Sequence, residues 1–511
     1  MTTTYAIKQY YNGKNIFLTG GTGFLGKFLI EKLLRSTNVE KIYVLIRPKK
    51  ELSAQERIDQ MFSSKLFEKL RELKPESVNK IVPIIGDCLH PGLGISTEDR
   101  NLLIETVQIV FHAAATIRFD DFLKSAILTN LRSARDMAYL ALEMKNIEVF
   151  LHVSTAYCNI EARKIVDEVL YPPFGSWKDA IELAEQGDSH IVNILTQKYI
   201  ENFPNTYTYT KRLTEHCINE ILVGKIPTII CRPSIVIAAI KDPIPGYIDN
   251  FNGPVGLHLA GATGLLRSVY GDIDIITDHC FVDNIIKLML VSIWEKGISR
   301  DKETITIYHA NKSHDLRLTY KLLLDMSEPL LWHQPFDKKV WFPGTTMTKS
   351  FWIFYINVIL FHVFPALVID LLLWLSGHTP FIFKLQKKIY ISNMAVHYFT
   401  LNEWTFRNEY FKNVFKKIPK EEISDSDFMI QITTKDEFTN FYSQTCHWVR
   451  VFLLKEKEEI SDELRTKTLR MYYLDKAVKA VFFGWLAWTL FIKINILEIV
   501  FGQILTYWQK L

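Results

Sequence analysis

The stretch "NIFLTGGTGFLGKFLIEKLL" (residues 15–34) joins a short apolar run to an amphipathic segment through a glycine-rich turn. The glycines are spaced Gly20-x-x-Gly23-x-x-Gly26. Gly20 permits a tight turn, Gly23 lets the backbone approach a pyrophosphate, and Gly26 allows a helix to pack closely on a strand. The N–H groups at the start of that helix attract phosphate. The stretch therefore predicts a dinucleotide-binding unit, because a turn that merely connects two elements would not need three glycines at this spacing.

Strand and helix patterns alternate through the first half of the chain. Short apolar runs predict strands at 15–19, 41–47, 80–87, 107–115, 148–154 and 227–234. Helical patterns lie between them, at 24–36, 53–73, 120–146 and 207–223. This alternation predicts an α/β fold with a Rossmann-type doubly wound parallel sheet. The stretch 241–300 is richer in Gly, Pro and Asn, and we expect it to form insertions that face the ligand.

The chain becomes more apolar after about residue 330. The run "FWIFYINVILFHVFPALVIDLLLWLSG" (351–377) is long enough to span a bilayer. Asn357, His362, Pro365 and Asp370 interrupt this run. A pair of buried or interfacial helices is therefore the alternative to a membrane span.

The last part of the chain has three sections of different character. Residues 384–455 predict a compact helical module, and 453–467 predict a charged linker. The tail 477–511 is apolar again, although Lys493 and Glu498 interrupt it. Its aromatic residues suit a membrane interface: Phe482, Phe483, Trp485, Trp488, Tyr507 and Trp508. We therefore expect the C-terminal third to attach to a membrane, the alternative being that both apolar stretches pack as ordinary core helices.

The composition narrows the classes of function. The 511 residues are 48% hydrophobic, which is high for a soluble enzyme. The net charge of +4 is nearly balanced, so nothing indicates a nucleic-acid partner. The six cysteines are scattered without a CxxC motif, so we expect reduced thiols facing the cytosol and no metal site. Residues 1–17 lack the apolar core of a signal peptide, which argues against secretion.

The ends of the predicted strands carry side chains suited to a phosphorylated cofactor. Arg47 stands where an acidic residue would hold the ribose of NAD, with Lys49 and Lys50 nearby. A cation there can pair with a 2′-phosphate, which favours NADP; a solvated basic turn is the alternative. Asp87 ends the third strand and is placed to accept from an adenine amine. The small residues of "HAAA" (112–115) would let the cofactor lie close to the fourth strand.

A tyrosine and a lysine in "NTYTYTKRLTE" form a candidate catalytic pair. Tyr207 and Lys211 are four residues apart and share one face of a predicted helix. The fifth strand ends in "HVSTAY", which places the hydroxyl of Ser154 or Thr155 at the same edge of the sheet. We expect the lysine charge to lower the pKa of the phenol toward neutrality. The hydroxyl would add a hydrogen bond to an oxygen that gains negative charge as a hydride arrives.

These motifs together resemble the eukaryotic fatty acyl-CoA reductases, which belong to the extended short-chain dehydrogenase/reductase group. The resemblance runs from about residue 12 to 456 and includes "TGGTGFLGKFLIEKLLRS", "KIYVLIRPKK", "VFHAAATIRFD", "YTYTKRLTE" and "HYFTLNEWTFRNE". It implies an NADP-binding Rossmann domain over 12–330 and a smaller helical C-terminal domain over 345–456. An apolar, membrane-associated tail would follow over 477–508.

The resemblance implies a two-step reduction of a long-chain acyl-CoA to a primary alcohol, with NADPH used twice. Tyr207 with Ser154 or Thr155 would stabilise the oxyanion, CoA would leave, and the retained aldehyde would be reduced by a second NADPH. Lys211 would also hold the nicotinamide ribose. The register of related folds favours Thr155 over Ser154.

The resemblance also implies a set of residues that contact the cofactor. Asn130 matches an asparagine that supports the active-site lysine through water in related enzymes, but Arg132-Ser133 replace the small residue that usually follows. Tyr209 and Cys158 are expected to be structural. The full cofactor set is Thr19, Gly20, Gly21, Thr22, Gly23, Phe24, Leu25, Gly26, Arg47, Asp87, Ala113, Ala114, Asn130, Tyr207, Lys211, Pro233 and Ser234.

Two other functions remain open from the sequence. One is an extended short-chain reductase that acts on a sterol or a sugar nucleotide, although a sugar-nucleotide enzyme would not need the apolar stretches. The other is a non-catalytic membrane scaffold, against which the intact Tyr207/Lys211 pair argues. We expect membrane lipid as a partner and a catalytic domain that faces the cytosol. The endoplasmic reticulum is preferred over the peroxisome, because "WQKL" resembles the peroxisomal tripeptide only loosely.

Overall fold

The computed structural model describes residues 6–48, 52–161, 163–311, 317–423, 427–430, 434–489 and 496–508. Lys49, Lys50 and Lys493 lie outside the described residues, as does the side chain of Glu498. The chain divides into two compact units. Unit 1 comprises Met1–Val255, Gly271–Leu323 and Asn393–Val449, and unit 2 comprises Gly256–Tyr270, Leu324–Ser392 and Arg450–Leu511.

Unit 1 is built on a parallel sheet with the strand order β11-β7-β5-β4-β1-β2-β3. The order reverses between β1 and β4, and in such a doubly wound sheet ligands bind beyond the carboxyl ends of the strands at this switch point. The predicted fold class is therefore confirmed. The strands are β1 (Asn15–Thr19), β2 (Lys41–Ile46), β3 (Ile81–Ile85), β4 (Ile109–His112), β5 (Val149–Val153), β7 (Thr228–Pro233) and β11 (Thr306–Ala310).

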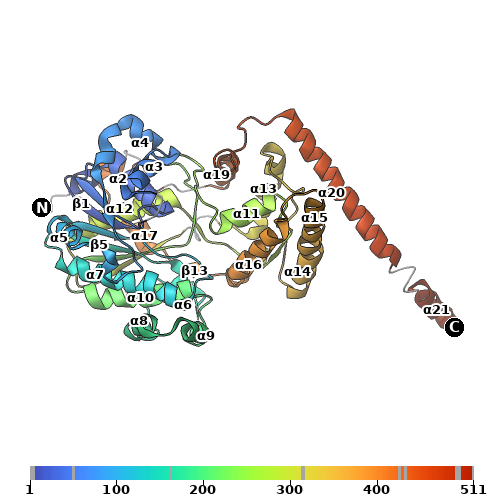
Figure 1. Ribbon diagram of the computed structural model, residues 1–511, viewed down its shortest axis with the longest axis horizontal. Helices are drawn as coiled ribbons and strands as arrows, with labels where there is room; N and C mark the ends of the chain where they lie inside the picture. The colour runs from blue at the N-terminus through green and yellow to red at the C-terminus, as the bar shows by residue number, and fades with distance from the viewer. Residues whose placement is uncertain are drawn as a thin grey trace. The chain divides into compact units, whose positions relative to one another are not determined.

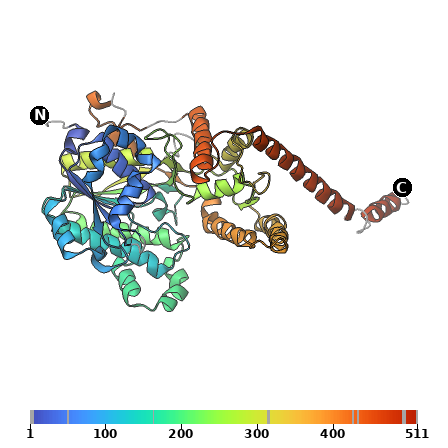
Figure 2. The ribbon, with the colours of Figure 1, turned by 45° about the horizontal axis from the view of Figure 1, so that its top comes forward.

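Helices cover both faces of this sheet, as Figures 1 and 2 show. Buried side chains of the strands, such as Phe17, Val110 and Phe150, form one apolar cluster with α7 and α10. On the opposite face α12 contacts α2, β5 and β7. The main helices of unit 1 are α2 (Phe24–Ser36), α3 (Ala54–Phe62), α5 (Thr97–Thr106), α7 (Ser133–Glu143), α10 (Thr206–Leu222), α12 (Val282–Ser299), α17 (Glu409–Phe415) and α19 (Lys435–Trp448).

Three segments of unit 1 differ from the sequence prediction. The insertion expected over 241–300 ends before α12, which is a buried core helix rather than a ligand-facing loop. The strand β11 was not predicted, although it pairs with β7 and completes the sheet. The helix expected over 120–146 is interrupted by a π-helical segment, Ile127–Arg132. Segments of this kind insert an extra residue into a helix and are frequent at functional sites.

The apolar run predicted over 351–377 forms one helix of unit 2. It consists of α14 (Phe351–Val358), a π-helical segment (Ile359–Val363) and α15 (Phe364–Leu375). This helix is long and apolar enough to cross a membrane by length and composition, and only 17% of its most apolar window is buried. The prediction of a pair of helices is therefore wrong, and so is the prediction that this stretch packs as an ordinary core helix.

The polar residues within that helix bind other segments of unit 2. His362 Nε2 accepts from the backbone N–H groups of Arg267 (3.0 Å) and Ser268 (3.2 Å). The carboxylate of Asp370 accepts from the backbone N–H groups at the start of α16 (Ile382–Thr400), including that of Phe383 at 2.8 Å. These interruptions therefore fasten an exposed apolar helix to its own unit.

The helix α20 (Asp462–Trp488) is bound to other segments of unit 2 through Asp475, and apolar side chains after that residue are exposed. Asp475 accepts from Trp341 Nε1 at 2.7 Å and from Arg267 Nη2 at 3.0 Å. Past this point apolar side chains lie exposed: Val478, Val481, Phe483, Trp485 and Trp488. The charged linker predicted over 453–467 is thus partly helical, since α20 begins within it. A further helix, α21 (Ile496–Trp508), follows in the sequence.

Candidate active site

In the turn between β1 and α2, backbone atoms pack directly against other backbone atoms, with no room for side chains at two of the glycines. Gly20 has a left-handed φ of 76°, and a Cβ there would lie 2.8 Å from the carbonyl of Ala113 at the end of β4. A Cβ on Gly26 would fall on the carbonyl oxygen of Gly20. Any side chain at either position would push β1, β4 and α2 apart, so both positions require glycine.

Gly23 has a different role from its two neighbours. A Cβ on Gly23 would meet only the Gly20 carbonyl oxygen, at 3.1 Å. Gly23 is the N-cap of α2, and no side chain caps this helix end. The first N–H groups of α2 therefore point out beside a position without a side chain, which is the arrangement that binds phosphate.

Two arginines lie beside this turn, Arg47 just after β2 and Arg57 on α3. Arg47 is exposed, and its carbonyl oxygen accepts from Arg57 Nη1 at 2.6 Å. Arg57 Nη2 lies 3.5 Å from Thr22 Oγ1 in the turn itself. Burial and the charge of Arg47 both lower the pKa of Arg57. The sequence predicted a role for Arg47 but not for Arg57. Arg57 lies ten residues further along the chain, and α3 brings it back to Arg47.

The other predicted cofactor residues lie along the same edge of the sheet. Asp87 follows β3, and its Oδ1 accepts from the N–H of Leu89 at 3.0 Å, which orients the carboxylate. After β4, the N–H groups of Ala113 and Ala114 donate to the backbone carbonyl and the hydroxyl of Thr19. The remaining members continue this edge: Gly21 and Thr22 in the turn, Phe24 and Leu25 at the start of α2, and Pro233 and Ser234 at the end of β7.

The helix α10 presents Tyr207 and Lys211 to the end of β5. Asn205 caps this helix, since its side chain accepts from the N–H of Thr208 at 2.9 Å. Lys211 is buried, and its Nζ donates to the carbonyl oxygen of Val153 at 2.6 Å. Tyr209 turns away and packs against Phe203, with ring centroids 5.6 Å apart, as the helical period predicted.

The structure separates the two candidate hydroxyl groups. The Thr155 side chain lies near enough to the Tyr207 phenol to lower the pKa of that phenol. Its Oγ1 also lies 3.5 Å from the carbonyl oxygen of Pro233. Ser154 Oγ instead donates to Glu215 Oε1 at 2.6 Å, away from the phenol. Thr155 is therefore the hydroxyl that shares a site with Tyr207.

The acid–base properties of this site differ from the sequence expectation. Burial raises the pKa of Tyr207 well above its usual value and the nearby Cys158 raises it further, which outweighs the hydrogen bond from Thr155. The predicted lowering by Lys211 is thus wrong for this structure, because burial dominates and the ammonium group is turned toward Val153. Burial also lowers the pKa of Lys211 to about 8. The phenol therefore keeps its proton at neutral pH, as a proton donor must.

A buried ion pair that the sequence did not reveal supports this site. Glu215 lies one turn after Lys211 on α10, and its Oε2 accepts from Arg232 Nη2 at 2.7 Å, with both side chains fully buried. Burial alone would raise the pKa of Glu215, but the charge and hydrogen bonds of Arg232 and the hydrogen bond of Ser154 lower it to about 2. Burial raises the pKa of Cys158 to about 12, so this thiol is a poor nucleophile and its predicted structural role fits.

Asn130 lies in the π-helical segment, and its side chain forms hydrogen bonds with Thr116 and Thr210. Its Oδ1 accepts from the N–H of Thr116 at 2.9 Å. Its Nδ2 donates to the Thr116 carbonyl oxygen at 3.3 Å and to Thr210 Oγ1 at 3.0 Å. These bonds use both donor hydrogens of the amide, whereas Oδ1 has a second lone pair that can still accept a hydrogen bond from water.

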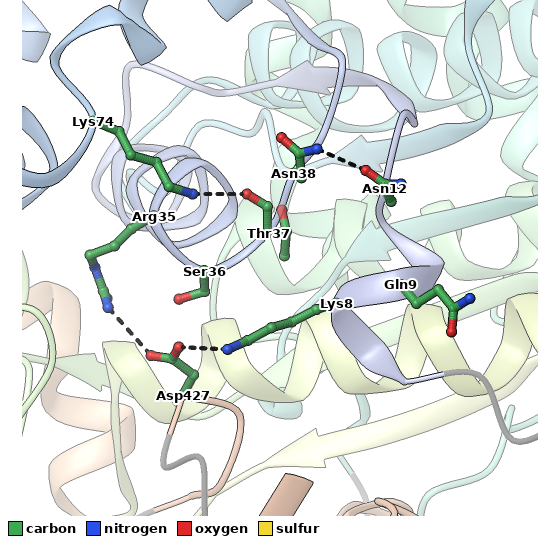
Figure 3. Close-up of a pocket in the computed structure, with 9 residues that line it drawn as sticks. All are labelled: Lys8, Gln9, Asn12, Arg35, Ser36, Thr37, Asn38, Lys74 and Asp427. Atoms are coloured by element: carbon green, nitrogen blue, oxygen red, sulfur yellow. Dashed lines mark hydrogen bonds and ion pairs between the residues drawn. The ribbon is translucent and has the colours of Figure 1, made fainter.

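A surface cavity of about 480 Å³ lies elsewhere in unit 1 (Figure 3). It is formed at the C-terminal end of α2, whereas the glycine turn is at the other end of that helix. Its charged groups are already paired: Asp427 lies 3.6 Å from Lys8 and 3.4 Å from Arg35, and Lys74 donates to the Thr37 carbonyl oxygen. This cavity is therefore not part of the candidate active site. Among the described residues no group of His, Cys, Asp and Glu could hold a metal ion.

Comparisons with known proteins bear on this site. A model of an NAD-binding family, described as male sterility protein, matches residues 18–289, and a second model with that description matches 361–456. The terminal R domain from the myxalamid biosynthetic pathway, a solved structure, has a TM-score of 0.57 at 18% identity, covering 88% of this chain and 93% of that one. At this identity the likeness supports the fold alone.

Curated relatives carry the resemblance along most of the chain. Fatty acyl-CoA reductase wat of Drosophila melanogaster is 35% identical over 95% of this chain and 93% of the relative. Fatty acyl-CoA reductase 1 of Homo sapiens is 37% identical over 82% of this chain and 81% of the relative. The chain therefore has a nicotinamide-cofactor-binding domain and belongs to the fatty acyl-CoA reductase family of oxidoreductases.

Proposed function

We propose that this protein reduces long-chain fatty acyl-CoA to the primary alcohol and CoA, at the expense of NADPH. The observation that carries the proposal is the meeting of Tyr207, Thr155 and Lys211 at the carboxyl edge of the sheet, next to the phosphate-binding turn. A proton donor, a second hydroxyl and a cation are the groups that a carbonyl reduction needs. Membership of the fatty acyl-CoA reductase family supports the choice of substrate.

Some of these residues would hold the cofactor, and others would transfer a proton to the substrate. The N-terminus of α2 holds the pyrophosphate, and Lys211 holds the ribose next to the nicotinamide. NADPH would supply one hydride for each of the two reductions, with the oxidised cofactor exchanged between them. Tyr207 gives its proton to the carbonyl oxygen, and the Thr155 hydroxyl hydrogen-bonds with the same oxygen as its charge grows. These groups act first on the thioester, from which CoA leaves as the thiol, and then on the aldehyde, which becomes the alcohol.

NADPH is proposed over NADH because of the two arginines beside the glycine turn. The Arg57 guanidinium is held at Arg47 through the Arg47 carbonyl oxygen. Two arginines at this turn favour an anionic partner, and the ribose 2′-phosphate of NADPH is such an anion. The lack of an acidic residue at Arg47 removes the partner that the ribose hydroxyls of NADH would have.

We further propose that unit 2 docks on a lipid bilayer, with the catalytic unit on the cytosolic side of the endoplasmic reticulum. The helix from Phe351 to Leu375 presents a long exposed apolar surface, which includes Leu371, Trp374 and Leu375. A monomeric soluble protein rarely exposes so large a continuous apolar surface. A membrane would also hold the acyl substrate and the alcohol product, both of which partition into lipid.

Replacing Tyr207 with Phe tests the proton donor. Wild-type protein with NADPH and palmitoyl-CoA should yield hexadecanol and free CoA, measured by extraction and chromatography. Y207F should lose about 10²–10⁴-fold in turnover, because no other group supplies the proton, while NADPH still binds. Y209F is the matched control and should retain activity. Wild-type protein that makes no alcohol would reject the proposed function, and unchanged turnover in Y207F would reject this donor.

Two substitutions separate the neighbouring hydroxyl groups. Thr155→Val should lower kcat by about 10²-fold, because it removes one hydrogen bond to the oxyanion. Ser154→Ala should leave kcat close to wild type and lower the free energy of unfolding by about 1–3 kcal/mol, since Glu215 loses a buried donor. Steady-state kinetics and urea unfolding measure the two effects. The reverse pattern would make Ser154 the catalytic hydroxyl.

Arg57→Gln tests the assignment of the cofactor. We expect KM for NADPH to rise by about tenfold or more, because a charged hydrogen bond to phosphate is lost, while KM for NADH stays unchanged. Arg100→Gln, at another arginine of unit 1, should change neither value. An equal rise for both cofactors would mean that Arg57 does not read the 2′-phosphate.

Three charges on α15 test the docking of unit 2. The triple variant L371E/W374E/L375E should bind phosphatidylcholine vesicles at least about tenfold more weakly in flotation assays, because each buried apolar side chain contributes about 1.5–3 kcal/mol. Leu73→Glu, at an equally exposed leucine of unit 1, is the control and should bind like wild type. Equal flotation of the triple variant and wild type would exclude α15 from the membrane contact.

A further inference from the structure

Two histidine rings lie stacked under the reaction edge of the sheet. His112 ends β4 and His152 lies directly opposite it on β5. Their ring centroids are 5.3 Å apart with an interplanar angle of 25°, and both residues are fully buried. Neither residue belongs to the catalytic set described above.

Most of the ring nitrogens of this pair lack a protein partner. His112 Nδ1 shares a hydrogen bond with Thr19 Oγ1 at 2.8 Å. Within the described part of the chain, His112 Nε2 and both ring nitrogens of His152 have no hydrogen-bond partner. Leaving such groups unpaired in a protein interior is costly, and the usual partner at such sites is a buried water molecule.

The pair faces the layer that holds Lys211. Side chains alternate along a strand, so His112 and His152 lie on the same face as Val110 and Phe150, which pack with α7 and α10. Burial and then the charge of Lys211 lower the pKa of both histidines, that of His112 to about 3. Both rings are therefore neutral at pH 7, and each offers one nitrogen as an acceptor.

Lys211 has N–H donors available for a further partner in this layer. An ammonium group carries three N–H donors, and Lys211 uses one of them on the Val153 carbonyl oxygen. The two amide hydrogens of Asn130 donate to the Thr116 carbonyl oxygen and to Thr210 Oγ1. The unpartnered ring nitrogens of the histidine pair lie on this face.

We propose that His112 and His152 bind buried water between the sheet and Lys211, and that this water is the second partner of the ammonium group. The water accepts from the lysine and donates to an imidazole nitrogen. Both histidines are thus positioning residues, which keep Lys211 charged and in place for Tyr207. The catalytic part of this inference rests on the proposed function.

The pH profile of turnover distinguishes this role from simple packing. Burial lowers the pKa of Lys211 to about 8, and two titratable groups nearby oppose this shift, Cys158 after β5 and Glu215 on the same helix. Turnover in wild type should therefore fall as the pH rises through about 8 and the ammonium is lost. Losing the water would lower that pKa further and move the descending limb to lower pH.

Two substitutions at one position provide the test. His152→Phe fills the space of the ring without nitrogens and should shift the descending limb of kcat against pH down by about one unit. His152→Gln keeps an amide that can hold water and should stay near the wild-type limb. Leu151→Ala, on the opposite face of β5, should lower the free energy of unfolding without shifting the descending limb of kcat against pH. Identical limbs in His152→Phe, His152→Gln and wild type would overturn the proposal.

A crystal structure of the full chain gives a readout that does not depend on activity or on the folding of any variant. Ordered water should lie within about 3 Å of a ring nitrogen of His152 and of Lys211 Nζ. Density without such water would overturn the inference even if the enzyme makes alcohol. Conversely, wild type that makes no alcohol would reject the proposed function while leaving the water site to be judged from the crystal.

Discussion

The hydrogen bond from Lys211 Nζ to the carbonyl oxygen of Val153 fastens α10 to the carboxyl end of β5. A buried ammonium group is tolerated only when its donors are satisfied, so this bond fixes where the helix lies on the sheet. Tyr207 lies one helical turn before Lys211. It is therefore held beside the end of β5, which Thr155 follows. The proposed catalytic groups come from a helix and from the segment that follows a strand, and their alignment depends on this contact.

A polar layer within the core surrounds that contact. The Glu215–Arg232 pair, Asn130 and the two stacked histidines are all buried between the sheet and its helices. Breaking one partner of a buried ion pair costs far more than the intact pair contributes, so such a layer favours one arrangement of the core over alternatives. The same burial raises the pKa of Tyr207 and lowers that of Lys211. One physical cause thus both orders the site and sets its protonation states.

In unit 2, an apolar helix is held in place although most of its apolar surface is exposed. His362 and Asp370 point into neighbouring backbone, whereas residues such as Trp374 stay exposed. Polar residues that interrupt the apolar run in the sequence are therefore the anchors of the helix, and not signs that it is a core element.

The sequence by itself determined the features that depend on near neighbours in the chain. The glycine spacing specified the β1–α2 turn, strand patterns specified most of the sheet, and the helical period placed Tyr207 with Lys211 and away from Tyr209. Only the tertiary structure decided which hydroxyl meets the phenol, brought Arg57 to the turn, and reversed the expected pKa shift of Tyr207. The physical reason is that hydrogen bonding between distant segments and burial are set by the folded surroundings, which no local pattern encodes.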